Sequence, residues 1–109
     1  MTRTGPVIMG HPTARAQLET DGVVLSFRTS DRTTGETHYR YERTGTSQGA
    51  VRITKETDRM HPNSISLVPY YPLSGFASTE DWVDAIKEMH GALNYGYIYR
   101  IELLEDNNV

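Results

Sequence analysis

Basic side chains are concentrated in one stretch of the sequence, residues 28–55, and such a stretch is suited to binding an anion. They are Arg28, Arg32, Arg40, Arg43, Arg52 and Lys55, and the acidic residues among them are Asp31, Glu36 and Glu42. The stretch has an excess of three positive charges in a chain whose formal net charge is -3. Because phosphate contacts dominate the affinity of nucleic-acid-binding proteins, it could form an anion-binding face. Scattered arginines on a solvated strand surface would have the same composition, so both interpretations stay open.

Histidines are the only nitrogen ligands that the chain offers to a metal. They are His11, His38, His61 and His90. No H-x-x-x-H or H-E-x-x-H pair occurs, so we expect no metal and no cofactor. His38 stands beside Arg40 on a predicted strand, where it either contacts a phosphate or a base or is simply exposed. His90 precedes Gly91 at a predicted helix end, where a cation is favoured, so we expect it to cap that helix.

Several classes of chemistry are excluded by what the sequence lacks. The chain has no cysteine, so it forms no disulfide, no thiolate metal site and no Cys nucleophile. It also has no Walker A motif, no G-x-G-x-x-G and no G-x-S-x-G nucleophile elbow. Residues 31–36 combine an arginine, two hydroxyl groups and a glycine. They either bind a phosphate or a base edge or form an ordinary hairpin turn.

Tyrosine is abundant, with seven in the 109 residues. Tyr97 and Tyr99 share one face of a predicted strand and are expected to fill the core. Tyr70 and Tyr71 lie in a loop bounded by prolines. A loop tyrosine near a basic strand can stack on an unpaired base of single-stranded RNA. Alternatively, one of the two rings packs over the mouth of the fold.

The hydrophobic pattern predicts the elements that must position these residues. Strands are expected over residues 23–28, 37–43, 50–55, 64–68 and 97–103, with a short extended piece at 7–9. Short strands without a β-helix-β rhythm predict an α+β fold, a small β-barrel of about five to six strands with one or two helices. Alternation within residues 23–28 places Ser26 and Arg28 on the less apolar face of the first long strand.

Two helices are expected. The first covers one or two turns within residues 11–20, with Pro12 at its start. The second begins after Ser78, which caps it, and ends at Gly91. Its apolar stripe has the spacing i, i+3, i+4 and i+7 and consists of Trp82, Ala85, Ile86 and Met89.

The length is that of one domain. We expect a flexible arm over residues 1–13, a single domain over 14–104 and a frayed terminus over 105–109. No run of about 18 apolar residues occurs, and the start lacks the apolar region of a secretory signal. We therefore expect a cytoplasmic protein that does not contact a membrane.

Three segments and their order resemble the ASCH domain, a family of the PUA-like superfamily of small β-barrels. The segments are GVVLSFR at residues 22–28, SGFASTEDW at 74–82 and YIYRIEL at 97–103. The resemblance covers residues 14–104. It implies a PUA-like barrel whose cleft binds RNA or a modified nucleotide.

Some ASCH proteins hydrolyse an amide of a modified cytidine with a lysine, a hydroxyl residue and a later glutamate. When the family's opening motif is aligned on Arg28, the hydroxyl position falls on Ser26. The lysine position falls on residues 23–24, both valine, and the glutamate position falls on Ser74. Both ionisable participants are therefore missing, and the resemblance does not transfer the activity. It implies that Ser26 and Arg28 face the cleft, with Arg32 as a local addition.

The leading hypothesis is a module that binds RNA or a modified nucleotide without catalysis. Arg28 would contact a phosphate or a base, and a ring from residues 70–71 would stack. The candidate binding residues are Ser26, Arg28, Arg32, His38, Arg40, Arg43, Arg52, Tyr70 and Tyr71.

Two alternatives remain. The first is a hydrolase that processes nucleic acid, either a ribonuclease or a nucleoside amidohydrolase, with Ser26, Glu36 and Lys55 as its available groups. The second is a protein-interaction domain that uses the acidic C-terminal half of the chain. Neither alternative is excluded by composition.

Overall fold

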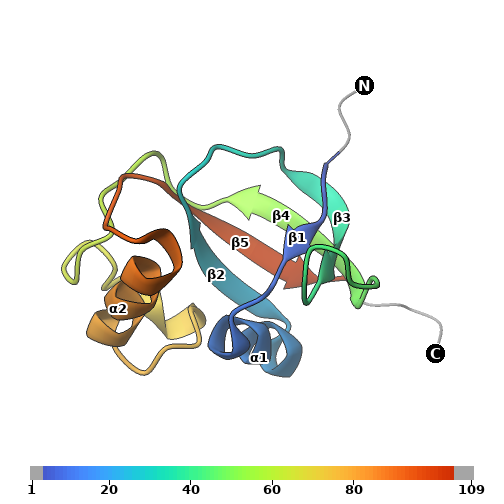
Figure 1. The fold of residues 1–109 in the computed structure, drawn as a ribbon, viewed down its shortest axis with the longest axis horizontal. Coiled ribbons are helices and arrows are strands. Elements are labelled where there is room, and N and C mark those ends of the chain that lie inside the picture. The colour runs from blue at the N-terminus through green and yellow to red at the C-terminus, as the bar shows by residue number, and fades with distance from the viewer. Residues whose placement is uncertain (1–3, 105–109) are drawn as a thin grey trace.

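Five strands form one mixed sheet, which curls into a half-barrel (Figure 1). The structure is a computed structural model, and it describes residues 4–104. The strands are β1 (Val7–Ile8), β2 (Val23–Arg28), β3 (Gly35–Arg40), β4 (Gly49–Lys55) and β5 (Tyr97–Leu103). Their order in the sheet is β1-β3-β4-β5-β2. β1 runs parallel to β3, and every other neighbouring pair is antiparallel.

α1 (Pro12–Asp21) links β1 to β2 and packs against β2 (Figure 1). Its first turn is fixed by the proline and by His11, whose Nδ1 accepts a hydrogen bond from the Thr13 amide at 3.2 Å. The helix ends at Gly22, which has a φ of 80° that other residues rarely adopt. The predicted helix is present and starts at Pro12 as expected, but with ten residues it is longer than one or two turns.

α2 (Thr79–His90) packs against the other side of β2, below the loop that follows it in the chain and leads to β5 (Figure 1). Ser78 caps it, because its Oγ accepts a hydrogen bond from the Asp81 amide at 3.1 Å. Gly91 ends it in the left-handed conformation, so both predicted ends are confirmed. A short 3-10 turn, η1 (Tyr71–Leu73), precedes this helix.

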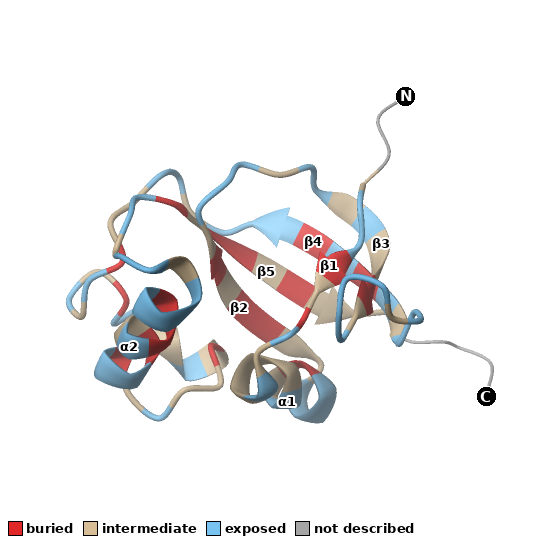
Figure 2. Cartoon of the chain, in the orientation of Figure 1, coloured by how far each residue is buried: buried red, intermediate tan, exposed pale blue. Residues whose placement is uncertain are grey.

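Two clusters of buried side chains lie on opposite faces of β2 and β5, which show red stretches between tan ones in Figure 2. The cluster inside the half-barrel consists of Val7, Met9, Leu18, Val24, Tyr39, Val51, Ile53, Tyr99 and Ile101. The cluster under α2 consists of Leu25, Phe27, Leu67, Trp82, Ile86 and Ile98. Strands covered on both faces lose the contrast between an apolar and a polar side.

β2 shows what this double coverage does to the polar residues of a strand. Leu25 and Phe27 point toward α2, whereas Val24 points into the half-barrel. Ser26 and Arg28 share the face of Val24, because side chains alternate along a strand. The less apolar face of β2 is therefore an interior face, and it carries a cation inward.

The strand expected over residues 64–68 is wrong, because that segment forms successive turns. Asn63 Oδ1 accepts hydrogen bonds from the amides of Ile65 and Ser66, each at 2.9 Å. Ser66 Oγ in turn donates to the carbonyl oxygen of His61 at 2.6 Å. Such local bonds from side chains to the backbone replace those of a sheet. Ile65 is consequently 82% exposed.

The segment expected as a flexible arm contributes to the fold from residue 7 onward. Val7 pairs with Tyr39 of β3, and Val7 and Met9 are both buried in the half-barrel. Residues 1–3, and the frayed terminus expected over 105–109, lie outside the described residues. The strand expected over 37–43 begins and ends earlier, as β3 at 35–40.

The apolar stripe expected on α2 is buried at Trp82, Ala85 and Ile86 but not at Met89, which is 49% exposed. The last turn of the helix extends past the core and borders a cavity. Among residues 4–104, no helix has the length and apolar character needed to cross a membrane.

Candidate ligand-binding cavity

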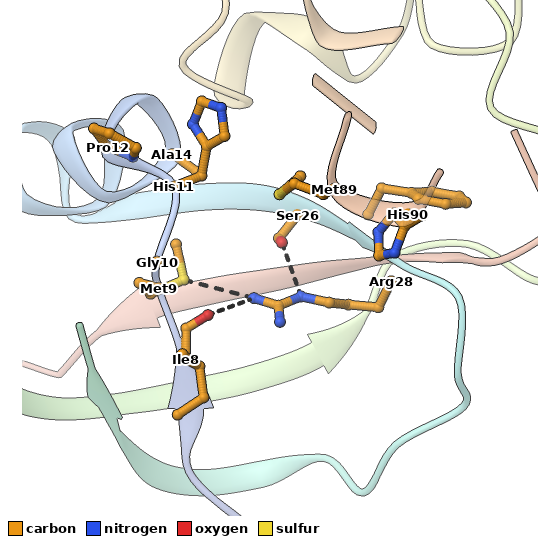
Figure 3. Close-up of a pocket in the computed structure, with 11 residues that line it drawn as sticks. Ile8, Met9, Gly10, His11, Pro12, Ala14, Ser26, Arg28, Met89 and His90 are labelled. Carbon is orange, nitrogen blue, oxygen red and sulfur yellow. Dashed lines mark hydrogen bonds between the residues drawn. The ribbon is translucent and has the colours of Figure 1, made fainter. Parts of the chain in front are cut away.

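A cavity of about 490 Å3 opens between the N-terminal segment, β2 and the last turn of α2 (Figure 3). Residues 8–14 form one wall, and Met89 and His90 form the opposite wall. Ser26 and Arg28 reach it from β2. The complete lining is Ile8, Met9, Gly10, His11, Pro12, Ala14, Ser26, Phe27, Arg28, Met89 and His90.

Arg28 provides the charge of this cavity. Its Nε donates to Ser26 Oγ at 3.0 Å, and its Nη2 approaches the carbonyl oxygen of Ile8 at 3.4 Å and Met9 Sδ at 3.7 Å (Figure 3). Within residues 4–104, no carboxylate forms an ion pair with it, and Nη1 has no hydrogen-bond partner. The guanidinium is thus oriented by neutral groups and keeps its charge uncompensated.

Burial lowers the pKa of Arg28. Desolvation among the surrounding protein atoms, followed by the nearby charge of Arg32, lowers the pKa of Arg28 from 12.5 to about 10. The side chain still carries its positive charge near neutral pH, at a cost in solvation that no acidic neighbour among residues 4–104 offsets through an ion pair. An anion in the cavity would supply the missing compensation.

His90 is the second polar group of the cavity. Its Nε2 is buried and has no hydrogen-bond partner within the described residues. The ring packs edge-on against Phe27, with ring centroids 6.3 Å apart. Burial, and then the charge of Arg28, lowers the pKa of His90 from its usual value. These surroundings therefore favour the neutral imidazole.

His90 was expected to cap the C-terminal end of α2, but its side chain does not have this role. Gly91 satisfies the end of α2, because its amide donates to the carbonyl oxygen of Lys87 at 2.7 Å. The imidazole points into the cavity instead (Figure 3). A signal was present in the sequence: His90 follows Trp82 by eight residues and so returns near the helix face that covers the core.

His11 lines the same cavity but is occupied as the cap of α1. Its ring also packs against Phe76, with centroids 5.2 Å apart. Most of the remaining lining is apolar, through the side chains of Ile8, Met9 and Met89. The cavity thus combines apolar walls with a cationic end, which suits an organic anion.

The groups proposed for hydrolysis do not converge. Ser26 lines the cavity, but its Oγ accepts a hydrogen bond from Arg28, and no general base in the described part of the chain is bonded to it. Glu36 and Lys55 do not line the cavity. Glu36 pairs with Arg52 at 2.9 Å, and Lys55 pairs with Asp31 at 2.7 Å. Within residues 4–104, no group of three or more His, Asp or Glu side chains could hold a metal ion.

The other predicted binding residues lie outside the cavity. Arg32 donates to the carbonyl oxygen of Gly5 at 2.7 Å and so ties down the N-terminal segment. Arg40 donates to His38 Nε2 at 3.2 Å and to the carbonyl oxygen of Arg43 at 3.1 Å. These contacts leave His38, Arg40 and Arg43 as a separate group on β3 and the turn that follows it.

The two loop tyrosines pack against the fold. Tyr70 and Tyr71 are both half-buried against the cluster under α2. They are not part of the cavity lining. Of the residues predicted to bind a ligand, the structure brings Ser26 and Arg28 together in one cavity, and His90 joins them from α2.

Comparison of the chain with protein families, with curated proteins and with solved structures found no match. The case for a function therefore depends on the geometry of the cavity.

Proposed function

We propose that the protein binds a nucleotide or modified nucleotide in this cavity, without catalysis. The observation that carries the proposal is the uncompensated guanidinium of Arg28 inside a cavity with apolar walls. A volume of about 490 Å3 falls in the range typical of sites for small organic ligands. A nucleotide has the matching parts, an anion and a flat apolar base.

The resemblance to the ASCH domain supports the same ligand class. A five-stranded half-barrel is compatible with a PUA-like fold, and that resemblance implied that Ser26 and Arg28 face a cleft. The proposal assigns this chain to the PUA-like barrels on these two grounds together.

The ligand that we propose is a single nucleotide, either free or presented by an RNA. A long RNA tract would need several cations along its backbone. Arg52 and Lys55, however, are engaged by acidic partners, and Arg40 is bonded to its neighbours on β3. Two cations of the basic stretch are thus already paired with carboxylates, which weakens the case for an extended strand on this face.

Calorimetric titration with nucleoside 5′-monophosphates tests the proposal. The variant Arg28→Met should weaken binding about tenfold to a hundredfold, since hydrogen bonds to charged groups contribute about 1.5–3 kcal/mol. Arg52→Met is the matched control, because Arg52 pairs with Glu36 away from the cavity, and it should bind like wild type. Fluorescence of Trp82, the single tryptophan, verifies that each variant is folded.

Salt dependence separates the single nucleotide from the RNA tract. Binding that engages one phosphate should weaken only slightly with salt, whereas binding of a strand weakens steeply, because each phosphate contact releases counterions. Equal affinities of wild type and Arg28→Met, or a steep salt dependence, would contradict the proposal.

A further inference from the structure

The cavity holds a second group that lacks a partner. His90 Nε2 is buried within the described residues without a hydrogen bond, on the wall opposite the N-terminal segment. Arg28 reaches the same cavity from β2, with Nη1 unbonded among residues 4–104. Buried polar atoms are normally satisfied, so the unsatisfied Nε2 of His90 points to a ligand, and the unbonded Nη1 of Arg28 is a charged donor in the same cavity that such a ligand could also bond.

The charges around His90 come from few elements. β2 presents Arg28, and the segment before α1 presents His11, whose Nδ1 is already bonded to the Thr13 amide. Phe27 of β2 covers the ring of His90 without adding a charge. Of the residues that the structure describes, no Asp or Glu lines the cavity.

We infer, on the basis of the proposed nucleotide-binding function, that the cavity selects a phosphate monoester whose dianion is shared between Arg28 and the protonated imidazole of His90. The guanidinium and the imidazolium supply two positive charges, and a phosphate monoester supplies two negative ones. A phosphodiester has one negative charge, so it would leave the second cation uncompensated.

Binding is then coupled to the uptake of a proton. Burial and the charge of Arg28 oppose the protonation of His90, so its neutral form is favoured before an anion binds. A dianion between the two groups favours the imidazolium and raises the pKa of His90 in the complex. Affinity for a dianion of constant charge should therefore fall as the pH rises through the pKa of His90 in the complex.

Sulfate tests the anion pair without a nucleoside and keeps its charge across the titration. The imidazole resonances of His90, assigned with His90→Gln, are followed by NMR over about pH 5–8, in sulfate and in chloride at equal ionic strength. We expect sulfate to raise the pKa of His90 by about one unit, a tenfold change in proton affinity. His61, which packs on Tyr95 outside the cavity, is the internal control and should not respond to sulfate.

Selectivity is tested with a nucleoside 5′-monophosphate and its 5′-methyl phosphodiester at about pH 7.5, where the monoester carries most of its second charge. Wild type should prefer the monoester about tenfold. His90→Gln retains a hydrogen-bonding side chain that cannot become charged, so the preference should fall close to one while binding persists. The control His61→Gln should keep the full preference.

The two experiments separate the inference from the proposed function. A raised pKa of His90 in sulfate, without binding of any nucleotide, supports the anion pair and contradicts the nucleotide. Nucleotide binding that depends on Arg28, with no response of His90 and no change of preference in His90→Gln, overturns the inference alone. The absence of any anion effect on His90 overturns it in either case.

Discussion

The backbone of Gly96 lies directly against that of Arg28. A Cβ atom at position 96 would stand 2.4 Å from the carbonyl oxygen of Arg28 and 2.6 Å from Cζ of Phe27. Gly96 also forms a two-way backbone bridge with Met60, which fixes the chain just before β5. The end of β2 that carries Arg28 into the cavity is therefore held by a close approach that only glycine permits.

Substitution of Gly96 by alanine should destabilise the protein. The new methyl group would contact backbone, which cannot move aside as a flexible side chain does, so a cost of about 1–3 kcal/mol is expected. Denaturation by urea, followed by the fluorescence of Trp82, measures it. Gly5→Ala is the matched control, because a Cβ there meets nothing within 4 Å, and it should leave the stability unchanged. Equal midpoints for the two variants would contradict the close approach.

The N-terminal segment should matter for stability from residue 7 onward. Met9 is 2% exposed and packs inside the half-barrel, so Met9→Ala should cost about 2–5 kcal/mol. Met89 lines the same cavity but is 49% exposed, and Met89→Ala should cost no more than about 0.5 kcal/mol. The same urea experiment compares the two. A negligible effect of Met9→Ala would instead support the flexible N-terminal arm that the sequence predicted.

Local patterns predicted most of the elements, because their signals are contained within a few residues. The hydroxyl of Ser78 and the left-handed Gly91 delimit α2 in the sequence as they do in the structure. Residues 97–103 alternate regularly and form β5 with those bounds. The strand predicted over residues 64–68 is wrong because the side chains of Asn63 and Ser66 form hydrogen bonds with the local backbone, which the apolar pattern does not show.

The candidate site could be predicted only in part, since it depends on how distant segments meet. Ser26 and Arg28 share a strand face, which alternation shows. That this face is an interior one follows from the coverage of β2 on both sides, which no local pattern contains. The helical spacing shows only that His90 lies near the core-facing side of α2, whereas its place opposite residues 8–14 arises from the packing of α2. Arg52 looked equally available in the sequence, but Glu36 on the neighbouring strand engages it.

Acid should weaken the fold partly through Asp31. Its Oδ1 accepts hydrogen bonds from Lys55 Nζ at 2.7 Å and from the Tyr99 hydroxyl at 3.0 Å. Lys55 first, and Tyr99 second, hold the pKa of Asp31 below its usual value. A carboxyl whose pKa is lowered by folding stabilises the protein above its unfolded pKa of about 4. This contribution disappears as the pH falls through the lower pKa of the folded state.

The free energy of unfolding, measured by urea at several pH values, should therefore fall less steeply below about pH 4 in Asp31→Asn than in wild type. The asparagine keeps an oxygen for the Tyr99 hydroxyl but cannot be protonated in this range. The difference in slope between wild type and Asp31→Asn is therefore caused by protonation of the Asp31 carboxylate. Asp58 is exposed and forms no ion pair among residues 4–104, which makes Asp58→Asn the matched control. Its slope should equal that of wild type. Identical slopes for wild type and Asp31→Asn would show that the contact with Lys55 does not persist in solution.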